Sequence, residues 1–103
     1  MEDFPKWKPQ KRTLQMMHCD DLKLRMQIIR NAASNFISKP EVRKRLFKIK
    51  GDRCYICGNK AIQIDHKISA HRFAEDPTLN IAELNSLDNL YPICTKCNAS
   101  KAP

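Results

Sequence analysis

The sequence predicts a small α+β protein in which helices precede a metal-stabilised unit of strands and a terminal helix. Three observations predict this fold class. Helical patterns fill the first fifty residues, an alternating strand pattern begins after Gly51, and two CxxC pairs frame the second half. A chain of 103 residues fits one small domain. Because a domain of this size buries only a modest core, we expect an added constraint such as a bound metal.

The first twelve residues form a predicted arm. Two prolines and dense charge in residues 1–12 disfavour a helix. Phe4 and Trp7 alternate there with cationic side chains, a pattern that suits stacking on bases and contact with phosphates. The alternatives are that the arm is frayed, or that its two rings pack onto the protein's own domain.

A helix is predicted from residue 13 to about residue 37, with a break near residues 19–21. Asp20 or Asp21 can cap the second part, because a carboxylate accepts hydrogen bonds from the free backbone amides of a first turn. Cys19 lies outside any motif and is expected to be a small buried apolar side chain. Helical spacing gathers a candidate core on one face, consisting of Leu22, Met26, Ile29, Ala33 and Phe36.

A second helix is predicted between Ser38 and Gly51. Ser38 is a candidate cap, Pro40 suits a first helical turn, and Gly51 suits the end of the helix. The inward face is expected to hold Val42, Leu46 and Phe47. The outward face gathers cations, namely Arg43, Lys44, Arg45, Lys48 and Lys50.

The net positive charge of the chain is confined to its first half. Residues 1–50 carry 13 Lys and Arg against 5 Asp and Glu, a net charge of +8, whereas residues 51–103 carry 6 of each kind. A basic block of this kind favours a polyanion such as DNA or RNA as partner. The alternative is a solvated helical surface rich in lysine.

Neither a membrane span nor a secretory signal is recognisable in the sequence. No apolar run is long enough to cross a bilayer, and the chain begins MEDFPKWK. We therefore expect a cytoplasmic protein with no membrane partner. In that reducing compartment, paired cysteines bind metal more often than they form disulfides.

Beyond Gly51 the pattern changes from helical to alternating. A tight turn is followed by a predicted strand whose two faces carry Ile62, Ile64 and His66 on one side and Gln63 and Asp65 on the other. Residues 70–87 are expected to be irregular. Residues 89–94 form a short apolar stretch, and residues 95–101 predict the start of a terminal helix.

Four of the five cysteines form two CxxC pairs, Cys54 with Cys57 and Cys94 with Cys97. A CxxC turn presents two sulfurs to one ion, and Zn²⁺ takes four thiolates in a tetrahedron. The 36 residues between the pairs mean that one ion would close a long loop and tie the strand region to the terminal helix. The sequence therefore predicts a structural Zn²⁺ site. The alternatives are a thiol redox pair or disulfides.

The segments IDH at Ile64–His66 and DNLYPICTKCNASK at Asp88–Lys101 resemble the HNH endonuclease family, in the zinc-bearing form found in small phage nucleases. The segment RKRLFKIKGDRCYICG resembles the helix and first knuckle that lead into that family's motif. The resemblance covers residues 38–103 and implies a ββα-metal module. It leaves residues 1–37 as a basic arm and helical extension in front of an HNH nuclease domain.

The resemblance implies roles for individual residues. His66 matches the general base, Asp65 matches the neighbouring metal ligand, and Asn89 matches the middle Asn that braces the loop holding the histidine. Asn98 stands where many members have a final histidine, and it matches the Asn that serves as a second metal ligand in some branches. Carboxylate and amide oxygens are hard ligands that suit Mg²⁺ or Mn²⁺, with Ni²⁺ a further candidate.

One geometric condition accompanies this assignment. Neighbouring residues of a regular strand face opposite sides, so Asp65 and His66 can serve one site only if the strand ends or bulges there. Lys101 lies three positions after Asn98 and shares its helix face, so it can contact the same phosphate. His71 and Arg72 are candidates for the phosphate or the metal.

We therefore expect a metal-dependent DNA endonuclease that activates water through His66. The alternative is a zinc-stabilised nucleic-acid-binding module without catalytic activity, and a thiol redox protein is a third interpretation. DNA is the expected partner, alongside other phage proteins if the resemblance extends to a phage role. The candidate nucleic-acid contacts are Arg43, Lys44, Lys48, Arg72 and Lys101.

Overall fold

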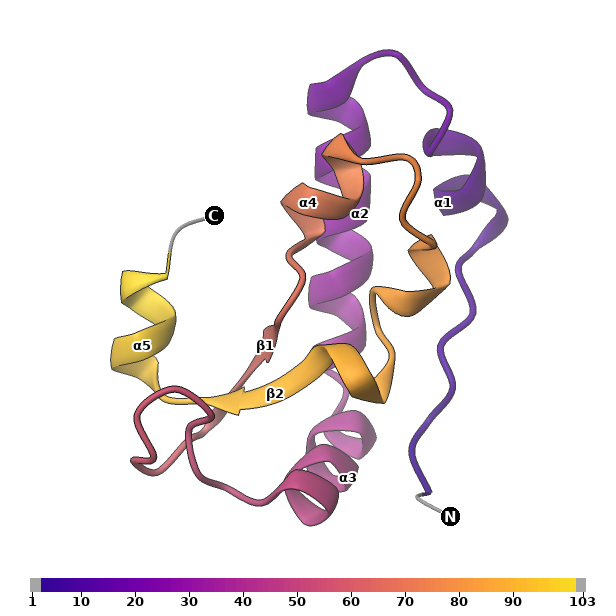
Figure 1. The fold of residues 1–103 in the computed structure, drawn as a ribbon. Helices are drawn as coiled ribbons and strands as arrows, with labels where there is room; N and C mark the ends of the chain where they lie inside the picture. Colours follow the sequence, from indigo (N-terminus) through magenta and orange to yellow (C-terminus); the bar gives the residue numbers. More distant parts are fainter. Residues whose placement is uncertain (1–2, 102–103) are drawn as a thin grey trace.

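A two-stranded antiparallel sheet crosses the fold, with α5 on one side of it and α2 and α4 on the other (Figure 1). The structure is a computed structural model and describes residues 3–101. Strand β1 (Gln63–His66) pairs with β2 (Leu90–Ile93), so that Asp65 lies opposite Tyr91 and His66 opposite Leu90. The predicted α+β class is confirmed.

The N-terminal arm packs onto the domain rather than extending from it. Residues 3–10 contain no helix or strand. The ring of Phe4 meets Phe36 edge-on at a centroid distance of 6.1 Å, and the ring of Trp7 lies 6.5 Å from Phe36. Of the two roles expected for these aromatic rings, the structure shows the packing role.

The predicted break in the first helical region is present. Helix α1 (Lys11–Met16) and helix α2 (Leu22–Ile37) are separate. Oδ1 of Asp21 caps α2 by accepting from the backbone N–H of Leu24 at 3.2 Å. The expectation for Leu22 was wrong, because this side chain at the start of α2 is 42% exposed. Further along the same face, the buried side chains are Ile29, Ala33 and Phe36.

Helix α3 (Pro40–Lys50) begins and ends close to the predicted positions. Pro40 occupies the first turn, and Gly51 ends the helix with a φ of +81°, a conformation that favours glycine. The predicted cap at Ser38 was wrong. Because α2 runs to Ile37, the hydroxyl of Ser38 donates to the carbonyl of Ser34 in the last turn of α2 instead.

The region expected to be irregular contains a helix. Helix α4 (Ala70–Glu75) is capped by Ser69, whose hydroxyl accepts from the backbone N–H of Arg72 at 3.1 Å. Phe73 and Ala74 are buried against α2, so tertiary packing stabilises a helix that is too short to persist alone. Two short 3₁₀ helices follow, η1 (Ile81–Glu83) and η2 (Leu87–Asn89).

The hydrophobic core joins the first and second halves of the chain. Ile29 and Ala33 of α2 pack with Phe73 and Ala74 of α4. Phe36 packs with four buried side chains from α3 and the sheet, which are Val42, Leu46, Ile64 and Leu90. The predicted boundary at residue 38 therefore falls inside one packed unit.

The strand begins at Gln63, so Ile62 does not share a face with Ile64 as predicted, and the side chain of Ile62 is 57% exposed.

Over residues 3–101, no helix has the length and apolar character needed to cross a membrane. The chain ends in helix α5 (Thr95–Ser100), close to the predicted position.

Candidate metal centre and adjoining residues

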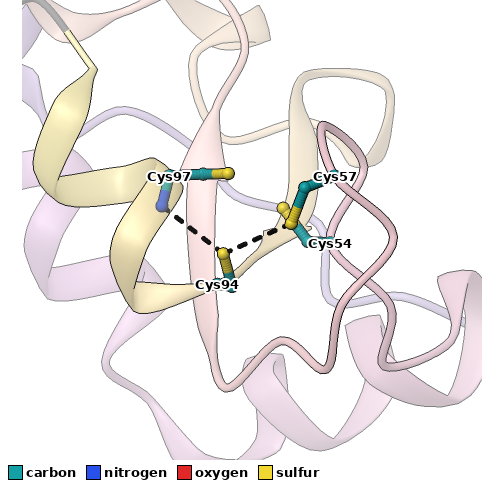
Figure 2. A group of neighbouring side chains, drawn as sticks. All are labelled: Cys54, Cys57, Cys94 and Cys97. Atoms are coloured by element: carbon teal, nitrogen blue, oxygen red, sulfur yellow. Dashed lines mark hydrogen bonds between the residues drawn. The ribbon is translucent and has the colours of Figure 1, made fainter.

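The four cysteines of the two CxxC pairs converge on one point (Figure 2). Cys54 and Cys57 lie on the turn after α3, where Gly58 has a φ of +80°. Cys94 caps α5, and Cys97 lies in its first turn. We call these four residues the cysteine cluster; their sulfur atoms all lie within 4.8 Å of one another.

The geometry of the cysteine cluster suits a tetrahedral ion. Zn–S bonds of about 2.3 Å place the sulfurs of a tetrahedron about 3.8 Å apart. The Sγ atoms of Cys57 and Cys94 are separated by 3.6 Å, and all five thiols, Cys19 included, are free of disulfides. The cluster can therefore hold a metal ion such as zinc. Among residues 3–101 it is the only group of three or more His, Cys, Asp or Glu side chains with this property.

The electrostatics of the cysteine cluster favour a cation. Burial alone would raise the pKa of the Cys54 thiol, but hydrogen bonds from the backbone of Cys57, Cys94 and Ile56 lower this pKa to about 6. Hydrogen bonds with Cys94 and Cys57, together with burial, raise the pKa of Cys97 to about 12. The first thiolate therefore forms readily and the next resists ionisation, which is the condition that a bound divalent ion relieves.

Asp65 lies in β1, where it is 8% exposed and shares one carboxylate oxygen between two donors. Oδ2 of Asp65 accepts from the hydroxyl of Tyr55 at 2.5 Å and from the ammonium of Lys101. Burial and the hydrogen bond to Asp65 both raise the pKa of Tyr55. The Tyr55 ring also stacks on the ring of Tyr91 at a centroid distance of 5.0 Å. The turn of the first CxxC pair, here called the first knuckle, therefore contacts both strands.

His66 is the last residue of β1, so the strand ends where the two candidate residues meet. Nε2 of His66 lies 2.7 Å from Oδ1 of Asn85, in the segment between η1 and η2. The side chains of Asp65 and His66 therefore have partners in different parts of the fold. Burial lowers the pKa of His66, and the nearby charge of Lys101 lowers it further, against opposing effects of Asn85 and Asp65.

Asn89 holds the chain that follows His66. Its Oδ1 accepts from the backbone N–H of Ile68 at 2.7 Å, and its Nδ2 donates to the carbonyls of Ile68 at 3.1 Å and Leu84 at 2.8 Å. The backbone N–H of Lys67 also donates to the carbonyl of Asn89 at 2.8 Å. Four hydrogen bonds thus fix the turn immediately after the strand.

Helix α5 runs along the face of β1 that carries Gln63 and Asp65. Nδ2 of Asn98 donates to Oε1 of Gln63 at 2.8 Å. The ammonium of Lys101 donates to the carbonyl of His66 at 3.0 Å as well as to Asp65. Asn98 and Lys101 thus share one face of α5 and contact alternate residues of the strand.

Two side-chain oxygens on this face are of the chemical kind that hard divalent ions take as ligands. Oδ1 of Asp65 and Oδ1 of Asn98 have no hydrogen-bond partner among residues 3–101. A carboxylate oxygen and an amide oxygen are ligands that Mg²⁺ and Mn²⁺ accept. The ammonium of Lys101 contacts the other oxygen of Asp65, so a cation is already attracted to this carboxylate.

The remaining predicted site residues fall into two groups. Lys44, Lys48 and Arg72 are exposed. The guanidinium of Arg43 instead donates to the carbonyl of Ile62 and lies over a phenyl ring of α3, so it ties the helix to the segment before β1. His71 contacts a methionine sulfur of α2 and a carboxylate of its own helix, and neither contact belongs to the site.

Sequence reasoning missed three residues that contact the candidate site. The sequence predicts no role for Tyr55 or Asn85 and places Gln63 only on a strand face, whereas the three side chains contact Asp65, His66 and Asn98. The role of Gln63 could have been predicted, because the alternating pattern places it on the same strand face as Asp65. Nothing in the sequence near Asn85 indicates its distant partners.

Comparison of the chain with protein-family models, with curated proteins and with solved structures gives no match. The function is therefore inferred from the geometry of these side chains and from the motif resemblance.

Proposed function

We propose that the protein is a metal-dependent HNH-type endonuclease that hydrolyses DNA phosphodiester bonds. The observation that carries the proposal is the position of α5. This helix extends from the cysteine cluster along β1, so that Lys101 contacts Asp65 and the strand end at His66, while Asn98 contacts Gln63 two positions earlier on the same strand face. The residues that match the motif thus lie at the end of β1 and along α5, with the side chain of Asp65 toward Lys101 and that of His66 toward Asn85.

Each side chain has a proposed task. Asp65 and Asn98 would hold a divalent cation, which when bound supplies stabilisation for the charge that builds on the phosphate and the leaving oxygen. His66 accepts a proton from the attacking water, and its lowered pKa keeps the imidazole neutral and able to do so. Asn89 fixes the turn after His66 by its four hydrogen bonds.

Lys101 has a task that requires it to move. Its ammonium now neutralises Asp65, with only partial exposure to solvent. A divalent ion on the same carboxylate would repel this ammonium, and a phosphate oxygen would attract it. We assign Lys101 to the phosphate of the bound DNA.

The same contact favours a second candidate function. Because Lys101 already satisfies the charge of Asp65, the pair can be a purely structural ion pair in a zinc-stabilised nucleic-acid-binding module. In that case the basic helices bind DNA and no bond is cleaved. The two candidates differ in one measurable property, which is cleavage.

A plasmid-nicking assay separates the two candidates. Zinc-loaded protein is incubated with supercoiled plasmid, with added Mg²⁺, Mn²⁺ or Ni²⁺ and without any added ion. The proposed function predicts nicking that depends on the added ion and that His66→Ala reduces by about 10²- to 10⁴-fold. His18→Ala is the matched control, because His18 is exposed and outside the site, and it should nick like the parent.

DNA binding and folding are measured on the same samples. His66→Ala should bind DNA and melt like a folded protein, so that its loss of nicking reports on chemistry. Binding without nicking in every ion would establish the second candidate in place of the first. Nicking by His66→Ala within a few-fold of the parent would remove His66 as the base.

A further inference from the structure

Asn85 is a nearly fully buried polar side chain that the proposed chemistry has not yet used. It is 1% exposed and lies between η1 and η2, where it is one of the few buried polar residues. Its Oδ1 is 2.7 Å from Nε2 of His66, and its Nδ2 donates to the carbonyl of Ala32 at 3.3 Å. A buried amide with partners at both ends is held in one orientation.

The orientation of the Asn85 amide determines the tautomer of His66. If the amide were flipped, its oxygen would face the carbonyl oxygen of Ala32, and two acceptors would oppose each other. With Oδ1 toward His66, the hydrogen between them must come from Nε2. A neutral His66 therefore carries its proton on Nε2 and has its lone pair on Nδ1.

Nδ1 of His66 remains open to solvent. It has no hydrogen-bond partner among residues 3–101. In that part of the chain, no buried side-chain nitrogen or oxygen lacks a partner. Nδ1 therefore reaches the surface, where a water molecule can donate to it.

The carbonyl that fixes Asn85 belongs to α2, a helix that lies outside the segment resembling the HNH family. Figure 1 shows α2 and α4 together on the side of the sheet away from α5. The path from Ala32 through Asn85 to His66 connects this helix to the end of β1. The two sides of the sheet thus hold different parts of the site, with Asp65 toward α5 and His66 toward α2.

We propose that Asn85 is a positioning residue that fixes His66 as its Nε2–H tautomer, and that α2 completes the site by orienting Asn85. This inference rests on the proposed function for its catalytic meaning, because a base at Nδ1 is useful only if water is activated there. The tautomer itself is a property of the folded protein. It can be tested whether or not the protein cuts DNA.

The test reads the two ring nitrogens of His66 by long-range ¹H–¹⁵N NMR on the zinc-loaded, ¹⁵N-labelled full chain at a pH where the imidazole is neutral. The parent should show a protonated Nε2 and an unprotonated Nδ1. Asn85→Leu, which keeps bulk and removes the acceptor, should show a mixture of tautomers. Asn85→Asp, which retains an acceptor oxygen, should keep the proton on Nε2.

Asn80→Leu is the matched control. Asn80 caps η1 by accepting from the backbone N–H of Ala82 at 3.1 Å, so its loss disturbs the same segment without contacting His66. The tautomer of His66 should stay unchanged in this variant. In the nicking assay, Asn85→Leu should lose on the order of 10-fold to 100-fold, as when partners that orient functional imidazoles are removed.

The parent spectrum alone can overturn the inference, even if Asn85→Leu fails to fold. A proton on Nδ1 of the parent, or a tautomer unchanged in folded Asn85→Leu, would rule out the positioning role. The expected tautomers in a protein that nicks no DNA with any ion would uphold the role of Asn85 and reject the nuclease.

Discussion

The hydroxyl of Tyr55 donates a hydrogen bond to the buried carboxylate of Asp65 at 2.5 Å. Tyr55 lies between the two cysteines of the first knuckle, and Asp65 lies in the strand that would carry the divalent ion. One hydrogen bond therefore joins the candidate zinc site to the candidate catalytic site. The position of the carboxylate depends on the conformation of the knuckle.

Tyr55→Phe should lower the free energy of unfolding by about 1 kcal/mol, since it removes one hydrogen bond from a partly buried pair. In a domain of this size the melting temperature should fall by about 4 to 8 °C. Tyr91→Phe is the control, because it removes the hydroxyl of the stacked ring and leaves the bond to Asp65. Equal melting curves for Tyr55→Phe and the parent would show that this bond has no net stabilising effect.

Cys57→Ser should lose bound zinc and lower the melting temperature by about 10 °C or more, because structural zinc stabilises small folds directly. Zinc content is measured by elemental analysis on the same samples. Cys19→Ser removes a thiol outside the cysteine cluster and should keep both zinc and stability. A parent purified without any metal would instead revive the thiol redox interpretation.

Asn98→Ala should reduce nicking by at least about 10-fold, because it removes a proposed ligand, and added Mg²⁺ should restore part of the loss. It also removes the hydrogen bond to Gln63. Gln63→Ala removes the same bond but retains the amide oxygen of Asn98, so it should nick nearly as well as the parent. Asn98→His should shift the preferred ion toward Ni²⁺ or Zn²⁺. Equal losses in both alanine variants would reject the ligand role.

The exposed cations of α3 should contribute to DNA affinity. Lys44 and Lys48 lie one helical turn apart on the same face, whereas Arg43 is engaged with the carbonyl of Ile62 and should not be changed. Reversing both lysines to Glu should flatten the log–log salt dependence of binding by roughly 2 units. The control reverses Lys23 and Arg30 on α2, which gives the same change in net charge. If both pairs have equal effects, net charge alone attracts DNA.

The stability of the protein should fall as the pH is lowered through the unfolded-state pKa of His66. Burial lowers the folded-state pKa of this residue, so below about pH 6.5 the unfolded chain binds more protons than the folded one. The contribution is fully present above that pH and is lost as the pH falls toward the folded-state pKa. Zinc release also lowers the stability in the same pH range, and it affects both proteins alike. The measurement therefore compares the free energies of unfolding of the parent and of His66→Gln, and the advantage of the parent should shrink on acidification. An advantage that stays constant with pH would contradict the assigned role of His66.

Local patterns predicted those parts of the fold that depend on near neighbours. The CxxC spacing, the break before Asp21 and the end of α3 at Gly51 all follow from turn and cap chemistry within a few residues. The same logic failed at Ser38, because one hydroxyl could cap either of two adjacent helices and the longer helix used it. It failed at α4 because Phe73 and Ala74 are stabilised by α2 side chains some forty residues earlier.

The candidate site shows the same division. The cysteine cluster was predictable, since zinc requires four soft ligands and the sequence offers them in two pairs. The contacts of Tyr55 and Asn85 were not, since each reaches a residue that only the tertiary fold brings near. An asparagine in a polar loop carries no sign of the histidine or the carbonyl that it will contact.

The long loop closed by the cysteine cluster affects how metal dependence can be demonstrated. A chelator strong enough to strip Mg²⁺ would also remove a zinc ion held by the four thiolates, and the loss of that zinc would loosen the turn that carries Tyr55. Chelation would therefore abolish cleavage by a nuclease and DNA binding by a binding module alike, so a chelator effect does not distinguish the two. Metal dependence has to be read by omission and re-addition of the weakly held ion, with zinc content verified after each step.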